Sequence, residues 1–204
     1  MSGIVNNTGA VSGVIGTTSA PAVGTGTDGY VFTATGAGVD PAWEAAAGGG
    51  GSGMTNADTW RITTSFTGAV NPVTSNWEQP DTDGLGYLGT AVTNSSGTFS
   101  FPSTGLWLIE AKAYMYMNAH ASYGGWGIYT TVNNSSYGEA GIQHAGFPAS
   151  GSYMGVFTNL IFDVTSVSTH KVQFGTTVQN ASIQFNGASG GSVTYANFLR
   201  LGDT

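Results

Sequence analysis

The sequence has few charged side chains and no cysteine, and these absences exclude several classes of protein. Charged residues make up 7% of the 204 residues, against about a quarter in an ordinary soluble domain. Only four residues are basic, and they are scattered along a chain with a net charge of −7. Because clustered Lys and Arg are needed to bind a phosphate backbone, we expect no nucleic-acid partner. Without cysteine, the chain can form no disulfide and no thiolate metal site.

Long apolar runs are also missing. No stretch approaches the roughly 20 apolar residues of a membrane-spanning helix, so we expect no membrane partner. The opening sequence, MSGIVNNTGAVSGVIG, has neither the basic start nor the apolar stretch that are typical of a secretion signal. We therefore expect the chain to fold in a cytoplasm and then to be assembled or released.

Glycine, small polar residues and aromatic residues are abundant. The chain has 33 glycines, and aromatic residues make up 12%. This composition predicts an all-β protein with many turns. The expected strands cover 59–66, 85–93, 97–101, 105–118, 125–132, 153–165, 169–178, 181–186 and 192–201. Such short antiparallel strands predict a sandwich or a jelly roll, and periodicity alone does not separate the two.

The composition divides the chain into an arm, a linker and a head. Residues 1–53 contain no Lys or Arg and hold 14 of the glycines. Such a segment cannot bury enough apolar surface to order itself alone. We expect an anchoring or trimerising arm over 1–44, a flexible linker over 45–53 and a head domain over 54–204. The arm would be supported by a neighbouring copy or a larger assembly, or would pack on its own head.

Part of the arm has a distinctive phrase. The residues from Gly29 to Trp43 read GYVFTATGAGVDPAW, in which 30–35 is a plausible strand. The phrase resembles a segment found ahead of the C-terminal head in bacteriophage fibre and tail proteins. The resemblance implies a small trimerising or attaching element, with Tyr30, Phe32 and Trp43 as anchor candidates. It also implies that residues 1–53 contact other virion proteins.

The head has a second distinctive spacing, Phe99-x-x-Pro102-x-x-Gly105-x-Trp107. It resembles the strand junction of the jelly-roll head shared by tumour necrosis factor and the first component of complement. The final strand, SVTYANFLRL, resembles the closing strand of that fold, although Asn197 stands where glycine is common. The resemblance implies a homotrimeric jelly roll that binds or supports rather than catalyses. The candidates for the trimer contact are Trp107, Tyr114 and Tyr116.

Two groups of side chains are candidates for binding. Tyr123, Trp126, Tyr129 and Tyr137 occur among glycines, serines and asparagines, a mixture that suits sugar or receptor contacts. The alternative, which we favour, is that they line a strand and a subunit interface. Asp81 and Asp83 precede a glycine and form half of a calcium loop, but the closing glutamate is missing. The alternative there is a turn leading into a strand.

No combination of residues indicates catalysis, so we expect neither an enzyme nor a cofactor. The preferred hypothesis is a structural protein of a bacteriophage virion, used in capsid decoration, a head fibre or a tail-fibre knob. The alternative is an adhesin whose head binds a glycan or receptor on the host surface. A bacterial surface or spore-coat protein is a third hypothesis.

Overall fold

The computed structural model describes the backbone of two short segments and almost all of the head: residues 30–33, 42–45, 54–82 and 84–204. The chain divides into two units, Met1–Ser52 and Gly53–Thr204. In the first unit, β1 (Tyr30–Thr33) and β2 (Ala42–Ala45) pair antiparallel, with Phe32 opposite Trp43. All the regular elements of the described residues are strands. That part of the chain has no helix long and apolar enough to cross a membrane.

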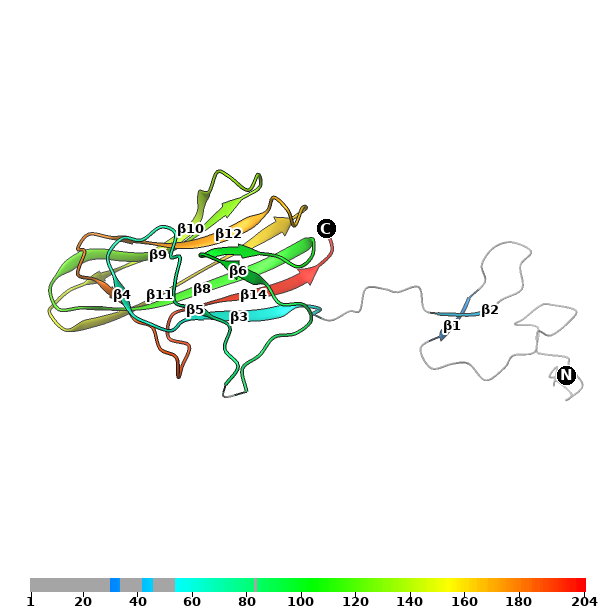
Figure 1. Ribbon diagram of the computed structural model, residues 1–204, viewed down its shortest axis with the longest axis horizontal. Helices are drawn as coiled ribbons and strands as arrows, with labels where there is room; N and C mark the ends of the chain where they lie inside the picture. The colour runs from blue at the N-terminus through cyan, green and yellow to red at the C-terminus, as the bar shows by residue number, and fades with distance from the viewer. Residues whose placement is uncertain (1–29, 34–41, 46–53, 83) are drawn as a thin grey trace, which may run out of the picture. The chain divides into compact units, whose positions relative to one another are not determined.

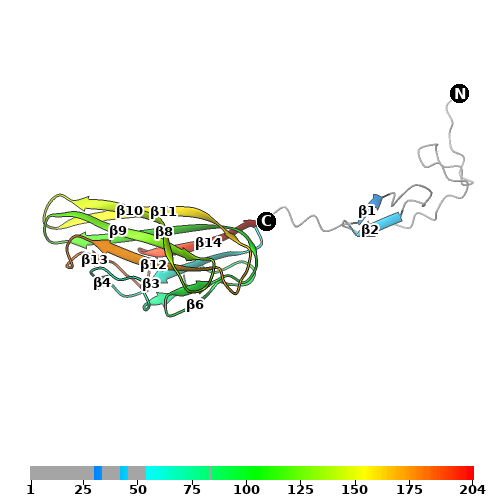
Figure 2. The ribbon, with the colours of Figure 1, turned by 90° about the horizontal axis from the view of Figure 1, so that it is seen from above.

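The second unit contains two antiparallel sheets that lie face to face (Figures 1 and 2). The larger sheet is built around the long strand β8, which pairs with β11 along its whole length on one side and with β14 and β13 on the other. Its seven strands are β3 (Ala57–Ile62), β4 (Phe66–Thr67), β5 (Trp77–Glu78), β8 (Gly105–Met117), β11 (Ser152–Val164), β13 (Gln184–Phe185) and β14 (Tyr195–Gly202). The smaller sheet has the order β10-β9-β12-β7-β6. Its strands are β6 (Thr93–Ser95), β7 (Thr98–Ser100), β9 (Ala121–Thr131), β10 (Gly138–Phe147) and β12 (Lys171–Val178).

The core between the sheets is rich in aromatic rings. Phe99 is fully buried, and its ring centroid lies 5.0 Å from that of Trp77 and 5.2 Å from those of Phe174 and Phe198. Alternate residues of β8, from Trp107 to Met117, face this core and are almost completely buried. The sandwich predicted from short strands and abundant aromatics is therefore confirmed.

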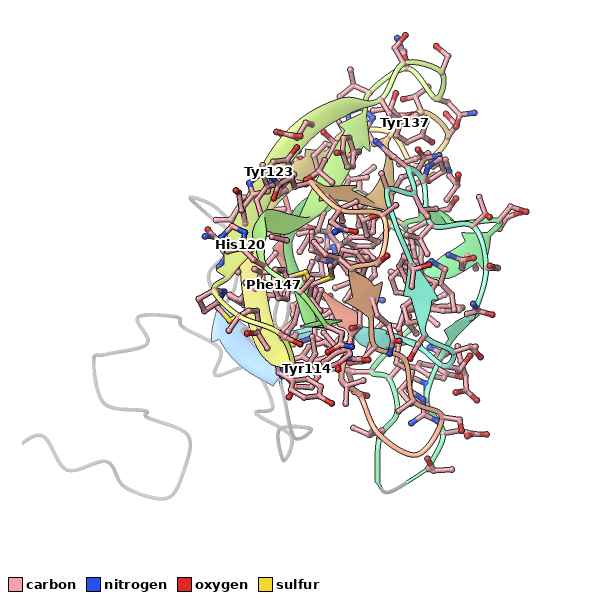
Figure 3. The ribbon with its side chains drawn as sticks, turned by 90° about the vertical axis from the view of Figure 1, so that its left-hand side faces the viewer. Tyr114, His120, Tyr123, Tyr137 and Phe147 are labelled. Carbon is pink, nitrogen blue, oxygen red and sulfur yellow. The ribbon has the colours of Figure 1, made fainter. Side chains whose placement is uncertain are left out.

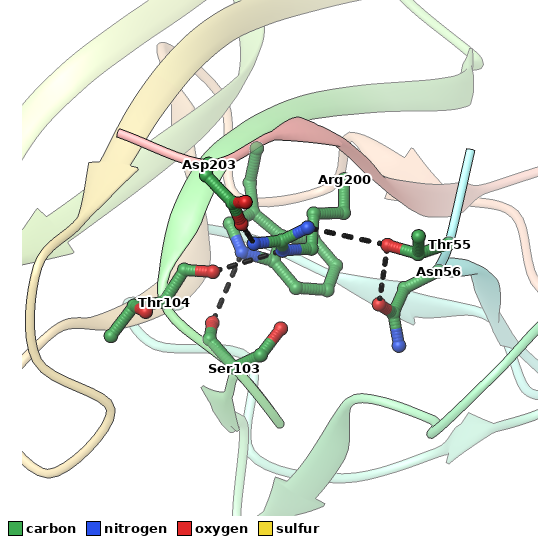
Figure 4. Close-up of polar contacts among 7 residues, drawn as sticks. Thr55, Asn56, Ser103, Thr104, Arg200 and Asp203 are labelled. Carbon is green, nitrogen blue, oxygen red and sulfur yellow. Dashed lines mark hydrogen bonds and ion pairs between the residues drawn. The ribbon is translucent and has the colours of Figure 1, made fainter. Parts of the chain in front are cut away.

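The residues of the Phe99–Trp107 motif hold the start of β8 in place. Gly105 has φ +130°, which favours glycine, and a Cβ there would lie 2.4 Å from the carbonyl oxygen of Gly202. Trp107 is buried and its indole Nε1 donates a hydrogen bond to the Ser103 carbonyl at 3.2 Å (Figure 4). The guanidinium of Arg200 donates to the Thr104 carbonyl at 2.9 Å in the same place. The motif is thus a joint between the start of β8 and the end of β14.

The sandwich has two distinct ends. Met54 and the C-terminus lie at one end, because β3 and the last residues of β14 pair beside the start of β8. The turns that join β8 to β9 and β10 to β11 lie at the opposite end, which we call the distal end.

One predicted strand is largely absent, and one strand was missed. The range 85–93 contains only an isolated bridge from Leu88 to Ala57 and the first residue of β6, because Gly84 and Gly89 adopt positive φ and interrupt the chain. The strand β10, which was not predicted, contains three glycines and is mostly solvent-exposed. As an edge strand held by its backbone pairing to β9, it has no need of an apolar face.

Candidate functional site

The outward face of the larger sheet is unusually apolar for an exposed surface. Along β8, alternation directs one set of residues into the core and leaves the other set, from Leu106 to Tyr116, on this face. On β11 the matching outward residues Tyr153, Phe157 and Ile161 are 57%, 47% and 63% exposed. An exposed group of large apolar side chains marks an interaction surface. We call the outward face of β8, β11 and β14 the assembly face.

Three tyrosines form an aromatic cluster at one end of the assembly face. Tyr153 is directly opposite Tyr116 in the strand pairing. The Tyr153 ring stacks on Tyr114 with 5.5 Å between centroids and lies 4.7 Å from the Tyr116 ring. Their mutual packing holds three amphipathic rings in place at the surface, which reduces the entropy lost when a partner covers them.

Polar groups cross the middle of the assembly face in a line. The Asn197 amide donates to Glu110 at 3.2 Å, and the Thr59 hydroxyl donates to the Asn197 amide oxygen at 2.9 Å. Next to this line, the Lys112 ammonium lies 5.6 Å from the centre of the Tyr195 ring. The two hydrogen bonds pair Thr59, Asn197 and Glu110 with one another, which lowers the cost of covering this part of the face.

A loop extends the face beyond β14. A groove of about 490 Å³ lies between the outward residues Asn197 and Leu199 and the loop that contains Tyr87 and Leu88. Tyr87 is 59% exposed and Leu88 is 49% exposed. The buried carboxylate of Asp58 holds this loop, accepting bonds from the Gln79 side chain at 2.6 Å and the Val92 N–H at 2.9 Å. Burial raises the pKa of Asp58, although these bonds and one from Trp60 oppose the effect.

The strand β11 is also an edge of the larger sheet, since among the described strands it pairs with β8 alone. The free edge of a long strand exposes backbone N–H and C=O groups that can pair with another chain. Ile161 and Phe157 are therefore exposed where edge and face meet, a position that a neighbouring molecule can cover from two sides.

The structure separates the predicted trimer residues. Tyr114 and Tyr116 lie on the assembly face, whereas Trp107 is fully buried inside its own head. The prediction that Trp107 is a trimer contact was therefore wrong. Both faces of β8 carry apolar residues, and Trp107 is one of the alternate residues that point into the core. Tyr30, Phe32 and Trp43 lie in β1 and β2, for which the structure describes the backbone pairing.

Three of the predicted aromatic binding residues lie on β9, where they are divided between its two faces, and Tyr137 lies just before β10. Trp126 is fully buried and stacks near Phe174, with 6.0 Å between centroids, so it is not part of a surface site. Tyr129 is 8% exposed, and its hydroxyl lies 3.4 Å from the Glu139 carboxylate. Burial and this carboxylate raise the pKa of Tyr129. Tyr123 is 40% exposed and Tyr137 is half-buried, and only these two present much surface to solvent.

The described residues contain no set of side-chain donors that would support the calcium hypothesis. Asp81 is exposed, and Asp83 lies outside the described residues. Within the described ranges, no three His, Asp or Glu side chains come close enough together to hold a metal ion.

Sequence reasoning missed the residues that make the assembly face continuous, namely Tyr153, Phe157 and Ile161 on β11. The signal was present in VFTNLIFDV, in which both strand faces carry apolar residues. What the sequence does not show is that β11 pairs with β8 in the register that places Tyr153 beside Tyr116.

Solved structures share this fold. Murine APRIL at pH 5.0 gives a TM-score of 0.54 with 10% identity, covering 72% of this chain and 98% of that chain. An Eiger TNF from S. frugiperda gives 0.54 with 11% identity, covering 72% and 93%. The head is a jelly roll of the tumour necrosis factor type. No protein-family model and no curated protein matches the sequence.

Proposed function

We propose that this protein is a non-enzymatic structural component of a bacteriophage virion. Its head forms a homotrimer through the assembly face, and residues 1–53 dock on other virion proteins. The observation that carries the proposal is the apolar, aromatic assembly face beside the free edge of β11. The expectation of three subunits rests on the resemblance to the jelly-roll head. The expectation of a virion location rests on the resemblance of the segment from Gly29 to Trp43 to phage fibre proteins.

Burial energies support self-association. Fully burying an Ile or Phe side chain contributes about 1.5–3 kcal/mol. Ile161 and Phe157 retain 63% and 47% of their exposure in the single chain, so covering them contributes roughly 1–2 kcal/mol each per copy. The three clustered tyrosines add to this sum. A closed ring also repeats every contact once per subunit, which favours a finite assembly over an open chain.

The native mass of the purified full chain tests the assembly, measured by light scattering during size exclusion. We expect three times the chain mass of 20.8 kDa. Ile161→Asp buries an unpaired charge in the interface and should give single chains. Val132→Asp is the matched control, because Val132 is 62% exposed but follows β9 in the other sheet. A single-chain mass for the wild type, or a trimeric Ile161→Asp variant, contradicts the proposal.

Location tests the virion part of the proposal separately. Gold-labelled antibody against the head should decorate purified particles of the phage that encodes the chain. Deletion of residues 1–53 should leave three heads per assembly and abolish incorporation into particles. Particles without label would refute the virion assignment and leave the trimer result intact.

A second candidate function is host attachment through a glycan or receptor. The observation that favours it is the chemistry of the distal end, where exposed aromatic rings lie among hydroxyl and amide side chains. If the head attaches the particle to its host, added soluble protein should compete with adsorption.

A further inference from the structure

The charged residues of the head are distributed very unevenly along the chain. No Asp, Glu, Lys or Arg occurs in five long runs, 62–77, 84–109, 113–138, 140–162 and 172–199. These runs are separated in sequence by the charged residues of the other parts of the head. Their length matters because each one spans a turn and the strand ends on both sides of it.

The jelly-roll topology brings four of these runs, all except 84–109, together at the distal end. Ser152 pairs with Met117 there, and Ala121 pairs with Phe147. The last charged row of the larger sheet is the one that contains Lys112 and Arg61, which are both opposite Tyr195. Among the described residues, every side chain beyond this row toward the distal turns belongs to a charge-free run.

This uncharged end contains a pocket. A hollow of about 370 Å³ is lined by Phe147, Pro148, Met154, Ala121, Ser122 and His120. Phe147 is fully buried and forms an apolar wall, whereas His120 and Ser122 are exposed. Figure 3 views this end and shows His120, Tyr123 and Phe147 on one side of it. An apolar hollow with a few polar groups is the usual form of a small-ligand site, and its volume falls in the usual range.

The exposed ring of Tyr123 lies on the same side of the distal end as His120 and Phe147 (Figure 3). The Tyr123 ring stands perpendicular to His144 with 5.5 Å between centroids. His144 is fixed in turn by a 2.9 Å bond between its Nε2 and the Thr177 hydroxyl. Gly125 leaves room for this arrangement, since a Cβ there would lie 2.4 Å from Cδ2 of His144. Tyr123 thus presents an exposed ring held by a well-supported neighbour.

We propose that the distal end, with the pocket between His120 and Phe147 and the exposed ring of Tyr123, binds an uncharged saccharide. This saccharide site is separate from the trimer contact. It rests on the proposed function in one respect, namely that the arm attaches the head to the particle by the opposite end. Met54, the first described residue of the head, precedes β3, whose start pairs with the end of β14 at that opposite end. The distal end is then the part presented to a cell surface.

The chemistry of the surface selects the ligand class. An anionic glycan needs Lys or Arg partners to offset the loss of hydration, and the distal end has none among the described residues. A neutral sugar ring has an apolar face that can stack on Tyr123, and hydroxyls that can bond to Ser122, His120 and the exposed amide of Gln179. Without ion pairs, the binding should be nearly independent of salt.

The test applies the full-length protein to an array of neutral oligosaccharides ending in hexose or N-acetylhexosamine, with sialylated and sulfated glycans on the same array. We expect neutral glycans to be retained, with affinity changing less than about twofold between about 50 mM and 500 mM NaCl. Tyr123→Ala and His120→Ala should each weaken binding roughly tenfold, and Tyr123→Phe should retain it. Val132→Ala is the control, because Val132 is 62% exposed and follows β9, away from both the distal pocket and the assembly face.

Three outcomes overturn the proposal: no neutral glycan is retained, anionic glycans alone are retained, or Tyr123→Ala and His120→Ala bind like the wild type. The native mass of every variant is recorded in parallel. A protein with the mass of three chains that binds no glycan refutes the saccharide site alone. A protein with the mass of one chain that binds neutral glycans refutes the trimer alone.

Discussion

Replacing Gly105 with alanine should strongly destabilise the head. Two separate effects combine at this position. The backbone has φ +130°, which an L-residue rarely adopts, and the added Cβ would lie 2.4 Å from the carbonyl oxygen of Gly202. Since that oxygen belongs to the backbone of β14, relief of the clash requires the end of the strand to move.

The expected loss follows from these two effects. An L-residue held in a sparsely populated backbone region costs about 1–3 kcal/mol. Movement of the end of β14 weakens the bonds from the Arg200 backbone N–H to Asn56 and from its side chain to Thr104, both 2.9 Å long. Each such bond contributes about 0.5–1.5 kcal/mol net. Gly105→Ala should therefore lower the free energy of unfolding by about 3–5 kcal/mol.

Three other glycines separate the two effects. Gly151 has φ +74° and nothing within 4 Å of an added Cβ, so Gly151→Ala should lose only about 1–2 kcal/mol. Gly187 lacks the positive φ, but its Cβ would lie 2.5 Å from the Thr64 backbone, and its substitution measures the clash alone. Gly138 has neither feature, and Gly138→Ala should stay within about 0.5 kcal/mol of the wild type.

Urea unfolding at one fixed protein concentration, followed by tryptophan fluorescence, measures all four variants. The slope of the transition should stay constant, because the surface exposed on unfolding does not change. A loss at Gly105 within about 1 kcal/mol of that at Gly138 would refute the reasoning. It would mean that the end of β14 is free to move and that the motif around Gly105 is not a structural joint.

Three further predictions concern buried groups. Burial raises the pKa of Asp58 above its ordinary value of 3.8, so the free energy of unfolding should fall as the pH rises through the raised pKa. Urea titrations below and above this range should show the fall in the wild type and not in Asp58→Asn, and equal pH profiles would contradict it. Glu78→Ala leaves the buried Arg61 without the carboxylate 2.8 Å from it and should lower the free energy of unfolding by about 3 kcal/mol. Asp203→Ala removes the 82% exposed partner of Arg200 and should lower it by less than about 1 kcal/mol. Similar losses for the two variants in thermal unfolding would refute the burial argument. Phe99→Ala should cost about 3–5 kcal/mol in the same assay, because Phe99 is fully buried among aromatic rings.

Some of the structural elements could be predicted from sequence because their signal is local. The alternation from Leu106 to Met117 predicts one long strand, and β8 covers Gly105–Met117. The strand β10 could not be predicted in the same way, because an exposed edge strand with three glycines has no apolar period. The strand expected over 85–93 fails for the opposite reason: it has apolar residues, but Gly84 and Gly89 turn the chain.

The candidate sites show the same limit at the level of single side chains. A cluster in sequence placed Tyr123 and Trp126 together, yet they point to opposite sides of β9 because three residues of strand reverse the parity. Trp107 and Tyr114, both proposed as contact residues, separate for the same reason. Which side of a strand faces the core depends on the partner sheet.

By itself, the sequence determined an all-β head, its low charge and the position of its longest strand, since composition and period-two alternation act within a segment. The tertiary structure alone decided which alternate residues of β8 and β11 remain exposed as the assembly face. It alone also gathered four charge-free runs at the distal end. Both outcomes depend on the pairing of strands such as β8 and β11, whose paired residues Met117 and Ser152 are far apart in the chain. Local propensity does not specify that pairing, which is selected by the burial of one shared core.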